Sequence, residues 1–138
     1  MNHWLFKTEP EAFSWEMQKE RGAQGEPWSG VRNWQAARNM KNMEKGDLGF
    51  FYHTGEEKRI VGIVEVIGEY RKDPTDETGR FGLVDVKAVR DVPEPVTLAQ
   101  CKADPKLKDM VLVKYSRLSV QPVAEAEWNH ICKLGGLK

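Results

Sequence analysis

Two apolar stretches that lie close together in the chain decide the fold: Asp47-Leu48-Gly49-Phe50-Phe51-Tyr52-His53-Thr54 and Ile60-Val61-Gly62-Ile63-Val64-Glu65-Val66-Ile67-Gly68-Glu69-Tyr70. The first is rich in aromatic residues and the second in β-branched residues, a composition typical of β-strands. In the second stretch the apolar run is almost continuous, as expected where both faces of a strand are covered or the sheet curls into a barrel. We therefore expect a curved sheet.

Four more strands are expected on either side of this pair. Residues 3–7 form a short apolar stretch, and residues 83–92 alternate cleanly enough to predict a half-exposed strand. Residues 110–113 and 118–120 are two further candidates, which brings the total to about six strands. No repeat, low-complexity tract or Ser/Gly linker divides the chain, so residues 1–138 are expected to form a single domain.

Two helices are predicted in the first half of the chain. Ser14 is a suitable N-cap for a helix over residues 15–21, and Gly22 is placed to end it. A second helix is expected over residues 33–45, with Gly46 just beyond its end. Its three-residue spacing predicts an apolar stripe formed by Trp34, Ala37, Met40 and Met43.

Two more helices are predicted in the second half. Thr97 and Gln100 form a capping box for a short surface helix that ends at Cys101 or Lys102. Residues 124–134 form an amphipathic helix that the following glycines end. Because strands and helices do not alternate regularly, we expect an α+β domain in which peripheral helices surround a curved, barrel-like sheet of about six strands.

Length and composition are those of one folded domain. The chain has 138 residues, of which 40% are hydrophobic and 30% charged, enough to close one hydrophobic core. No apolar run approaches the roughly 18 residues that span a bilayer, and the first residues lack the apolar stretch of a signal peptide. We expect no membrane partner and a cytoplasmic protein, or a nuclear one in a eukaryote.

The chain shows no sign of catalytic or cofactor chemistry. Cys101 and Cys132 are its two cysteines, and the three histidines are scattered without ligand spacing, so neither a disulfide framework nor a metal site is indicated. The motifs GxGxxG, GxxxxGK[ST], HExxH and GxSxG are all missing. We expect no cofactor and no enzyme, although a Cys/His nucleophile pair remote in the chain stays open.

Charge is balanced overall and uneven locally. The 21 basic residues equal the 21 acidic ones, so the whole-protein field does not favour general coating of DNA. Residues 28–45 and 102–117 each carry a surplus of Lys and Arg. These segments form either two positive faces or ordinary solvated surface.

Four polar segments lie directly beside aromatic residues. Lys7-Thr8-Glu9-Pro10 ends the first strand, because Pro10 prevents it from continuing as a paired central strand. Residues 25–33 form a Gly/Pro-rich loop that contains Trp28. Tyr52-His53-Thr54-Gly55 follows the aromatic strand. Residues 117–121 place Arg117, Ser119 and Gln121 on one polar face of a predicted strand, and together the four segments are able to line one pocket.

Three of these residues have two interpretations each. Trp28 is either a lid on the core or a platform for a ligand. His53 either lines the pocket or caps the turn that follows its strand. Glu9 either accepts a hydrogen bond from an amine of the ligand or forms an ion pair with Lys7 or Arg32, which we favour slightly.

Several long strings, in order and over nearly the full chain, closely resemble the EVE domain family. The resemblance implies a PUA-like fold, a curved β-barrel sheet with peripheral helices. The strings are Trp4-Leu5-Phe6-Lys7-Thr8-Glu9-Pro10, Trp28-Ser29-Gly30-Val31-Arg32-Asn33-Trp34-Gln35-Ala36-Ala37-Arg38-Asn39, Gly46-Asp47-Leu48-Gly49-Phe50-Phe51-Tyr52-His53-Thr54, Gly62-Ile63-Val64-Glu65-Val66 and Arg117-Leu118-Ser119-Val120-Gln121-Pro122.

This family is similar in turn to the YTH domain, which reads a methylated adenine in RNA with an aromatic cage. Lys7-Thr8 and Trp28-Ser29 stand where that relative has the Lys-Ser and Trp-Ser that frame its pocket. The second aromatic residue of the cage has no evident counterpart here.

The resemblance implies a nucleic-acid partner that carries a modified base, with DNA containing 5-methylcytosine or 5-hydroxymethylcytosine favoured over RNA, and a restriction-system protein as a possible further partner. Taking the base out of its stack costs a few kcal/mol, which stacking and edge hydrogen bonds recover. Arg32 and Arg117, with Lys7, are expected to contact phosphates. The expected base-binding pocket consists of Lys7, Thr8, Glu9, Trp28, Ser29, Val31, Asn33, His53 and Ser119.

Two alternatives stay open at this point. One is an RNA-binding module that reads a modified nucleotide, for which the deciding contact is to the 2′-hydroxyl. The other is a small-molecule enzyme or sensor in which Glu9 or His53 acts as acid or base in the same pocket.

Overall fold

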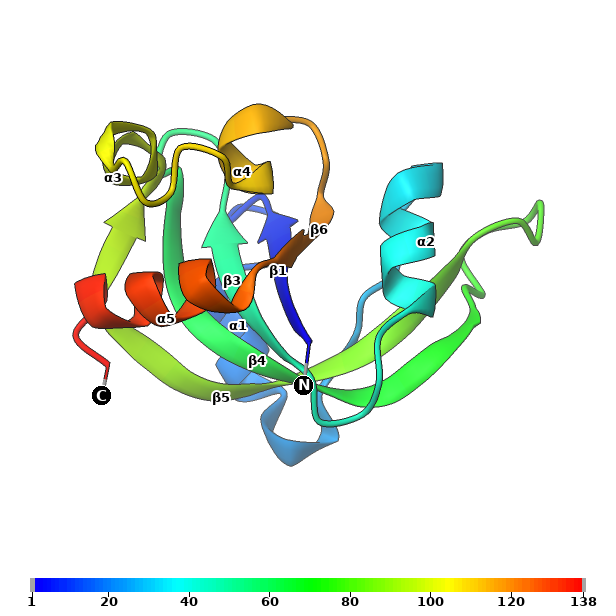
Figure 1. Ribbon diagram of the computed structural model, residues 1–138. Helices are drawn as coiled ribbons and strands as arrows, with labels where there is room; N and C mark the ends of the chain where they lie inside the picture. Colours follow the sequence, from blue (N-terminus) through cyan, green and yellow to red (C-terminus); the bar gives the residue numbers. More distant parts are fainter. Residues whose placement is uncertain (1, 138) are drawn as a thin grey trace.

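A computed structural model describes residues 2–137 and has an open, strongly curved sheet at its centre (Figure 1). Among the strands of this described part, only β1 and β3 run parallel, and all other neighbours are antiparallel. The edge strands β2 and β6 are not paired with each other, so the barrel does not close. In sheet order the strands are β2 (Glu26–Pro27), β5 (Gly82–Thr97), β4 (Arg59–Lys72), β3 (Leu48–His53), β1 (His3–Thr8) and β6 (Val120–Val123).

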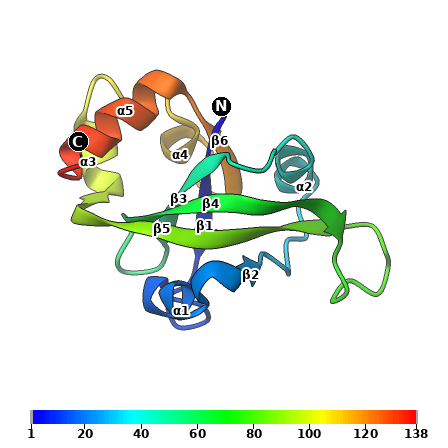
Figure 2. The ribbon, with the colours of Figure 1, turned by 90° about the horizontal axis from the view of Figure 1, so that it is seen from below.

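In residues 2–137 five α-helices surround the sheet, and the predicted α+β class is confirmed. Figure 2 shows α1 on the opposite side of β4 and β5 from α3, α4 and α5. None of the helices in residues 2–137 is both long and apolar enough to cross a membrane. The helices are α1 (Trp15–Glu20), α2 (Trp34–Lys41), α3 (Leu98–Ala103), α4 (Val111–Lys114) and α5 (Glu125–Leu134).

Two hydrophobic cores lie on the two faces of the sheet, because successive strand residues point to opposite sides. Phe6 and Phe51 belong to one core, which α1 and α2 cover. Their neighbours Leu5 and Phe50 belong to the other, which α3, α4 and α5 cover. The continuous apolar run of β4 contributes to both cores, as expected for a strand that is covered on both faces.

Capping residues set the ends of two helices as predicted. The Ser14 hydroxyl accepts a hydrogen bond from Met17 N at 3.2 Å, and Gly22, with φ of 59°, follows the end of α1. Thr97 and Gln100 form the complete capping box of α3. These contacts are local in sequence, which is why the sequence predicts them well.

Several expected boundaries are wrong. The strand predicted at residues 110–113 is helix α4, since a four-residue apolar run carries no period that distinguishes strand from helix. The last strand, β6, is Val120–Val123 and not residues 118–120, and the strand that completes the sheet is β2 (Glu26–Pro27), which was not predicted. Helix α2 ends at Lys41, four residues earlier than predicted.

Two predicted burial patterns also need correction. Trp34 is 57% exposed, because it occupies the first helical position of α2 and packs against Phe81 instead of the core. Cys101 lies on the predicted surface helix, α3, but its own side chain is fully buried, and burial raises the pKa of its thiol to about 11. A thiol that stays protonated at neutral pH is not an activated nucleophile.

Helix α1 is fixed on the sheet through Trp15, and this fixes the turn that precedes the helix. The indole lies over Gly62 of β4, where any Cβ atom would come within 2.2 Å of the ring. The Trp15 side chain donates to Asp91 Oδ1 at 2.7 Å, and its backbone N donates to His53 Nε2 at 3.0 Å. The turn that leads from β1 into α1 is therefore held rigidly, and Phe13 lies in it.

Candidate functional site

A cavity of about 440 Å³ opens where β1 ends. Its volume falls in the range of roughly 300–1,000 Å³ typical of small-molecule sites. We refer to it as the Trp28 cavity. Its walls come from three segments that follow one another in the sequence, namely the end of β1, the turn and helix α1 up to Arg21, and residues 26–32. Ser119 joins them from a distant part of the chain. Its lining consists of Lys7, Thr8, Ala12, Phe13, Met17, Arg21, Glu26, Pro27, Trp28, Ser29, Gly30, Val31, Arg32 and Ser119.

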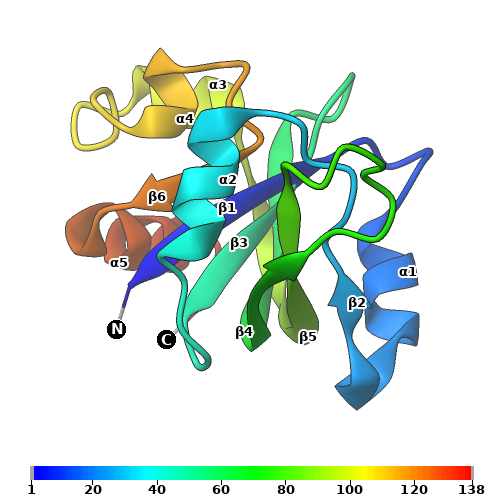
Figure 3. The same cartoon turned by 90° about the vertical axis from the view of Figure 1, so that its right-hand side faces the viewer.

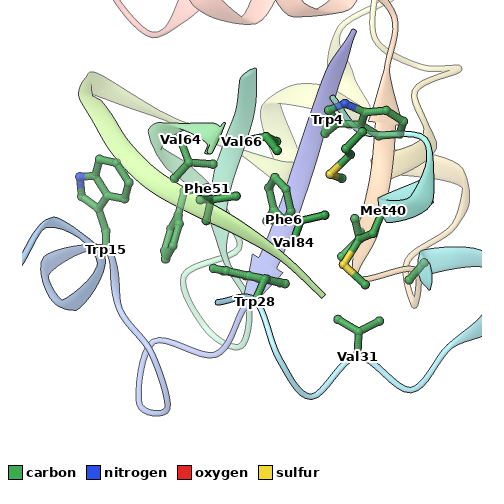
Figure 4. Close-up of a cluster of buried hydrophobic side chains, with 14 of the residues drawn as sticks. Trp4, Phe6, Trp15, Trp28, Val31, Met40, Phe51, Val64, Val66 and Val84 are labelled. Carbon is green, nitrogen blue, oxygen red and sulfur yellow. The ribbon is translucent and has the colours of Figure 1, made fainter. Parts of the chain in front are cut away.

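Trp28 is at once a core residue and a wall of this cavity. Only 7% of its surface is exposed, and its ring meets Phe6 and Phe51 edge-on, with centroids 5.2 and 5.7 Å away (Figure 4). Its backbone N donates to Val84 O at 2.8 Å, which extends the β2–β5 pairing by one residue. Trp28 therefore does not stand apart from regular structure in a free loop, as its Gly/Pro-rich surroundings suggested.

Phe13 is the second aromatic residue of the cavity, and the sequence analysis missed it. Its side chain is half-buried and meets Trp28 edge-on at 6.0 Å, while the Arg21 guanidinium lies 5.4 Å from its ring. The Thr8 hydroxyl donates to Phe13 O at 3.0 Å and ties this turn to the end of β1. The available signal was an apolar residue directly before an N-cap, a position that usually packs against its helix.

Two serine residues belong to the cavity lining. Ser29 follows Trp28, and Ser119 precedes β6 and accepts a backbone hydrogen bond from Lys7 N at 2.8 Å. Within residues 2–137 neither serine hydroxyl forms a hydrogen bond with the protein. Each is therefore free to donate to a ligand or accept from it.

The cavity lining carries three cations and one carboxylate, and each cation already has a protein partner. Lys7 Nζ donates to Ser116 O at 2.8 Å, and burial lowers its pKa. Arg21 forms an ion pair with Glu26 at 2.8 Å. Arg32 Nη1 lies 3.1 Å from Asp73 Oδ2. These contacts hold the three positive groups in place around the cavity.

Asp73 anchors the loop that carries Trp28 and Ser29. It lies at the end of β4, is buried, and accepts from Gly30 N at 2.8 Å as well as from Arg32. Although burial opposes its ionisation, hydrogen bonds from Thr75, Gly30 and Arg32 lower its pKa to about 2. Gly30 has φ of 85°, a left-handed conformation that favours glycine.

Seven of the eleven residues predicted for the site lie in the cavity lining: Lys7, Thr8, Trp28, Ser29, Val31, Arg32 and Ser119. His53 does not line it; its side chain is buried and accepts from the backbone N–H of Trp15, with Nδ1 2.9 Å from Glu57. Because Nε2 is occupied by that hydrogen bond, His53 is a structural residue that fixes the start of α1 at the end of β3.

Three more predicted residues lie outside the cavity. Glu9 is exposed and, within residues 2–137, forms no ion pair with Lys7 or Arg32, so the pairing we favoured is wrong. Asn33 caps α2, its Oδ1 accepting from Ala36 N at 2.9 Å. Arg117 lies in a turn and lines a neighbouring hollow with Asn33. The polar strand face expected at residues 117–121 does not form, since β6 begins at Val120 and Gln121 is buried.

The fold is an α+β domain built on a curved sheet, and a cavity lined by aromatic, hydroxyl and cationic side chains opens at the end of its first strand. This combination is typical of a small ligand-binding domain. The family model described as EVE domain matches residues 2–134. The chain belongs to the EVE domain family.

Solved structures agree with this assignment. Protein Atu2648 from Agrobacterium tumefaciens is 51% identical, with a TM-score of 0.96 over 99% of this chain and 94% of that chain. Human THYN1, crystallised in complex with 5-methylcytosine containing DNA, is 30% identical, with a TM-score of 0.92 over 100% of this chain and 99% of that chain. A YTH domain of Zygosaccharomyces rouxii MRB1, at 20% identity and a TM-score of 0.58 over 99% of this chain and 85% of that chain, shares the fold.

Proposed function

We propose that this chain is a non-catalytic reader of a modified base in nucleic acid, specifically of 5-methylcytosine in DNA. The base leaves the helix stack and enters the Trp28 cavity. The observation that carries the proposal is the lining of this cavity, which joins two aromatic rings, unpaired serine hydroxyls and fixed cations in one hollow.

Each part of the cavity has a counterpart in a nucleotide. Phe13 and Trp28 offer aromatic surface to the base, and stacking of this kind contributes about 1–3 kcal/mol per base. Ser29 and Ser119 are able to donate to or accept from the base edge. Arg32 is suited to a phosphate next to the extruded nucleotide, a contact that positions the strand without reading its sequence.

The preference for 5-methylcytosine over cytosine that one methyl group provides can be calculated from its burial. Ala12, Met17 and Val31 give the cavity an apolar portion. Burying one methyl group there stabilises the complex by about 0.8 kcal/mol, which corresponds to about a fourfold preference for 5-methylcytosine over cytosine.

We propose DNA over RNA because human THYN1, whose similarity extends over the whole of this chain, was crystallised with 5-methylcytosine containing DNA. The YTH neighbour was crystallised with N6-methyladenosine RNA, but its likeness extends to the fold alone. A restriction-system partner stays an expectation of the family resemblance.

The test is a binding panel of labelled 11-residue strands that differ at one central base: cytosine, 5-methylcytosine, 5-hydroxymethylcytosine, adenine or N6-methyladenine. Each strand is measured as single- and double-stranded DNA and as RNA at several salt concentrations. We expect DNA with 5-methylcytosine to bind about fourfold tighter than its unmodified match, or better.

The control variant is Val89→Ala, which shortens a 46% exposed side chain of β5 outside the cavity lining and should keep the full preference. Equal affinity for all strands of the panel would contradict base reading. A larger preference within the RNA series would overturn the choice of DNA. Mass spectrometry of the strand after incubation should return the unaltered base, and any change in its mass would contradict a non-catalytic role.

A further inference from the structure

A second hollow lies against the Trp28 cavity, between α2 and the segment that connects α4 to β6. Figure 3 shows the start of α2 beside α4 and this segment. The hollow has a volume of about 400 Å³, with Asn33 and Gln35 on one side and Lys114, Tyr115 and Arg117 on the other. It continues into a further hollow of about 340 Å³ that shares Gln35 and Tyr115. We call the two together the Tyr115 groove.

Only a thin wall separates the groove from the cavity. Lys7 lines the cavity, and its Nζ donates at 2.8 Å to the carbonyl of Ser116, which lines the groove. On the other side of the same wall, Arg32 lines the cavity and the next residue, Asn33, lines the groove. A strand with one nucleotide in the cavity therefore has its neighbouring nucleotide within reach of the groove.

The groove has the chemistry of a nucleotide site. Tyr115 is 62% exposed and offers an unused ring face on which any base stacks. The Asn33 side-chain oxygen is committed to the helix cap, which leaves its amide NH2 group to contact a base edge. The Gln35 amide already donates to Asn39 at 3.1 Å and accepts from Arg38 at 3.0 Å, so it retains one N–H and one lone pair for the same edge.

The charge of the groove suits a polyanion. Lys114 and Arg117 line the wide part, whereas no Asp or Glu among residues 2–137 lines either part. Lys114 pairs with Asp109 at 3.3 Å, but both side chains are more than half exposed, so this ion pair is weak and exchanges readily for a phosphate.

We propose that the Tyr115 groove is a second subsite, which binds the nucleotide next to the modified one. Tyr115 stacks the neighbouring base, and Arg117 contacts the phosphate that joins the two nucleotides. This subsite rests on the proposed function and deepens it, because it gives the reader a preference for a strand with an intact neighbour and not for a free modified base.

The experiment removes the neighbouring base from the ligand. Labelled single strands carry one 5-methylcytosine, with an intact or an abasic residue on its 5′ or its 3′ side. For the wild-type protein, removing the base on one of the two sides should weaken binding by about 5- to 150-fold, the loss expected for one stacked base. Removing the base on the other side should change little.

The variants assign this loss to Tyr115. Tyr115→Ala should bind intact and abasic strands equally while it keeps the preference for 5-methylcytosine over cytosine, and Tyr115→Phe should behave as wild type. Val89→Ala, which also shortens an exposed apolar side chain, is the matched control. The thermal midpoint of Tyr115→Ala should stay near that of the wild type, because the ring is mostly exposed.

Three results would overturn the subsite. If the wild type prefers 5-methylcytosine over cytosine but loses no affinity for abasic strands, the second subsite is wrong and the proposed function still stands. A Tyr115→Ala protein that loses the methyl preference itself would place Tyr115 in base reading instead. Wild-type self-association that Tyr115→Ala abolishes would make the groove a surface for a second copy of the chain. Failure of the proposed function is a separate result, namely equal binding of cytosine and 5-methylcytosine strands by the wild type.

Discussion

Trp28→Ala should destabilise the protein strongly, because the indole supports the core as well as the cavity. The side chain is 7% exposed and meets Phe6, Phe13 and Phe51 edge-on. Removing a buried Trp costs about 3–5 kcal/mol, and the loss of these edge contacts places Trp28→Ala toward the upper part of that range. Since the free energy of unfolding of a domain is about 5–15 kcal/mol, the variant should remain folded at low temperature, but with only a small remaining free energy of unfolding.

Urea unfolding at 15 °C, followed by far-UV circular dichroism, measures this cost, and the thermal midpoint should fall by about 10–20 °C. Trp28→Phe keeps an aromatic ring in the core and should lose clearly less stability. Binding of the 5-methylcytosine strand is then measured on both variants at a temperature where both are folded. A cost below about 1 kcal/mol for Trp28→Ala would refute the reasoning, because Trp28 would then not be a core residue.

Three other substitutions test the cavity. Asp73→Asn should cost about 2 kcal/mol of stability at pH 7. Because the pKa of Asp73 in the folded protein, about 2, is below its value in the unfolded chain, this contribution is present above about pH 4 and disappears as the pH falls through 2. Urea unfolding of both proteins between pH 7 and 2 measures it. Phe13→Ala should weaken binding of the 5-methylcytosine strand about 5- to 150-fold by fluorescence anisotropy, whereas unchanged affinity would remove Phe13 from the base site. Arg32→Gln should weaken modified and unmodified strands alike and reduce the salt slope by about one unit; loss of the methyl preference alone would mean that Arg32 touches the base.

The parts of the fold that the sequence predicts well depend on local patterns. The alternation of Leu5 and Phe6, and of Phe50 and Phe51, determines which core each side chain enters, and this alternation is visible in the sequence. Residues 110–113 were predicted wrongly because their conformation is set by packing under β6 and not by any local period.

The sequence predicts the outline of the cavity from the C-terminal end of β1 and from the Trp28 loop. The prediction is incomplete where tertiary contacts determine which residues line or support the cavity. His53 follows Tyr52 at the end of β3, but helix α1 docks there and takes its Nε2 as a partner for Trp15 N. Phe13 and Asp73 reach the Trp28 loop from segments that no spacing rule relates to it. Such pairings depend on how α1 and the β4–β5 connection fold back, which a single sequence does not reveal.

The central claim is that the modified base itself occupies the Trp28 cavity. An NMR titration of ¹⁵N-labelled protein with two strands, identical except for one cytosine 5-methyl group, tests this most directly. Amide shifts that differ between the two titrations should be confined to the cavity segments, above all Phe13, Trp28, Ser29 and Gly30. Methyl-dependent shifts centred on α5, on the far side of the sheet, or no difference between the two titrations, would contradict the account.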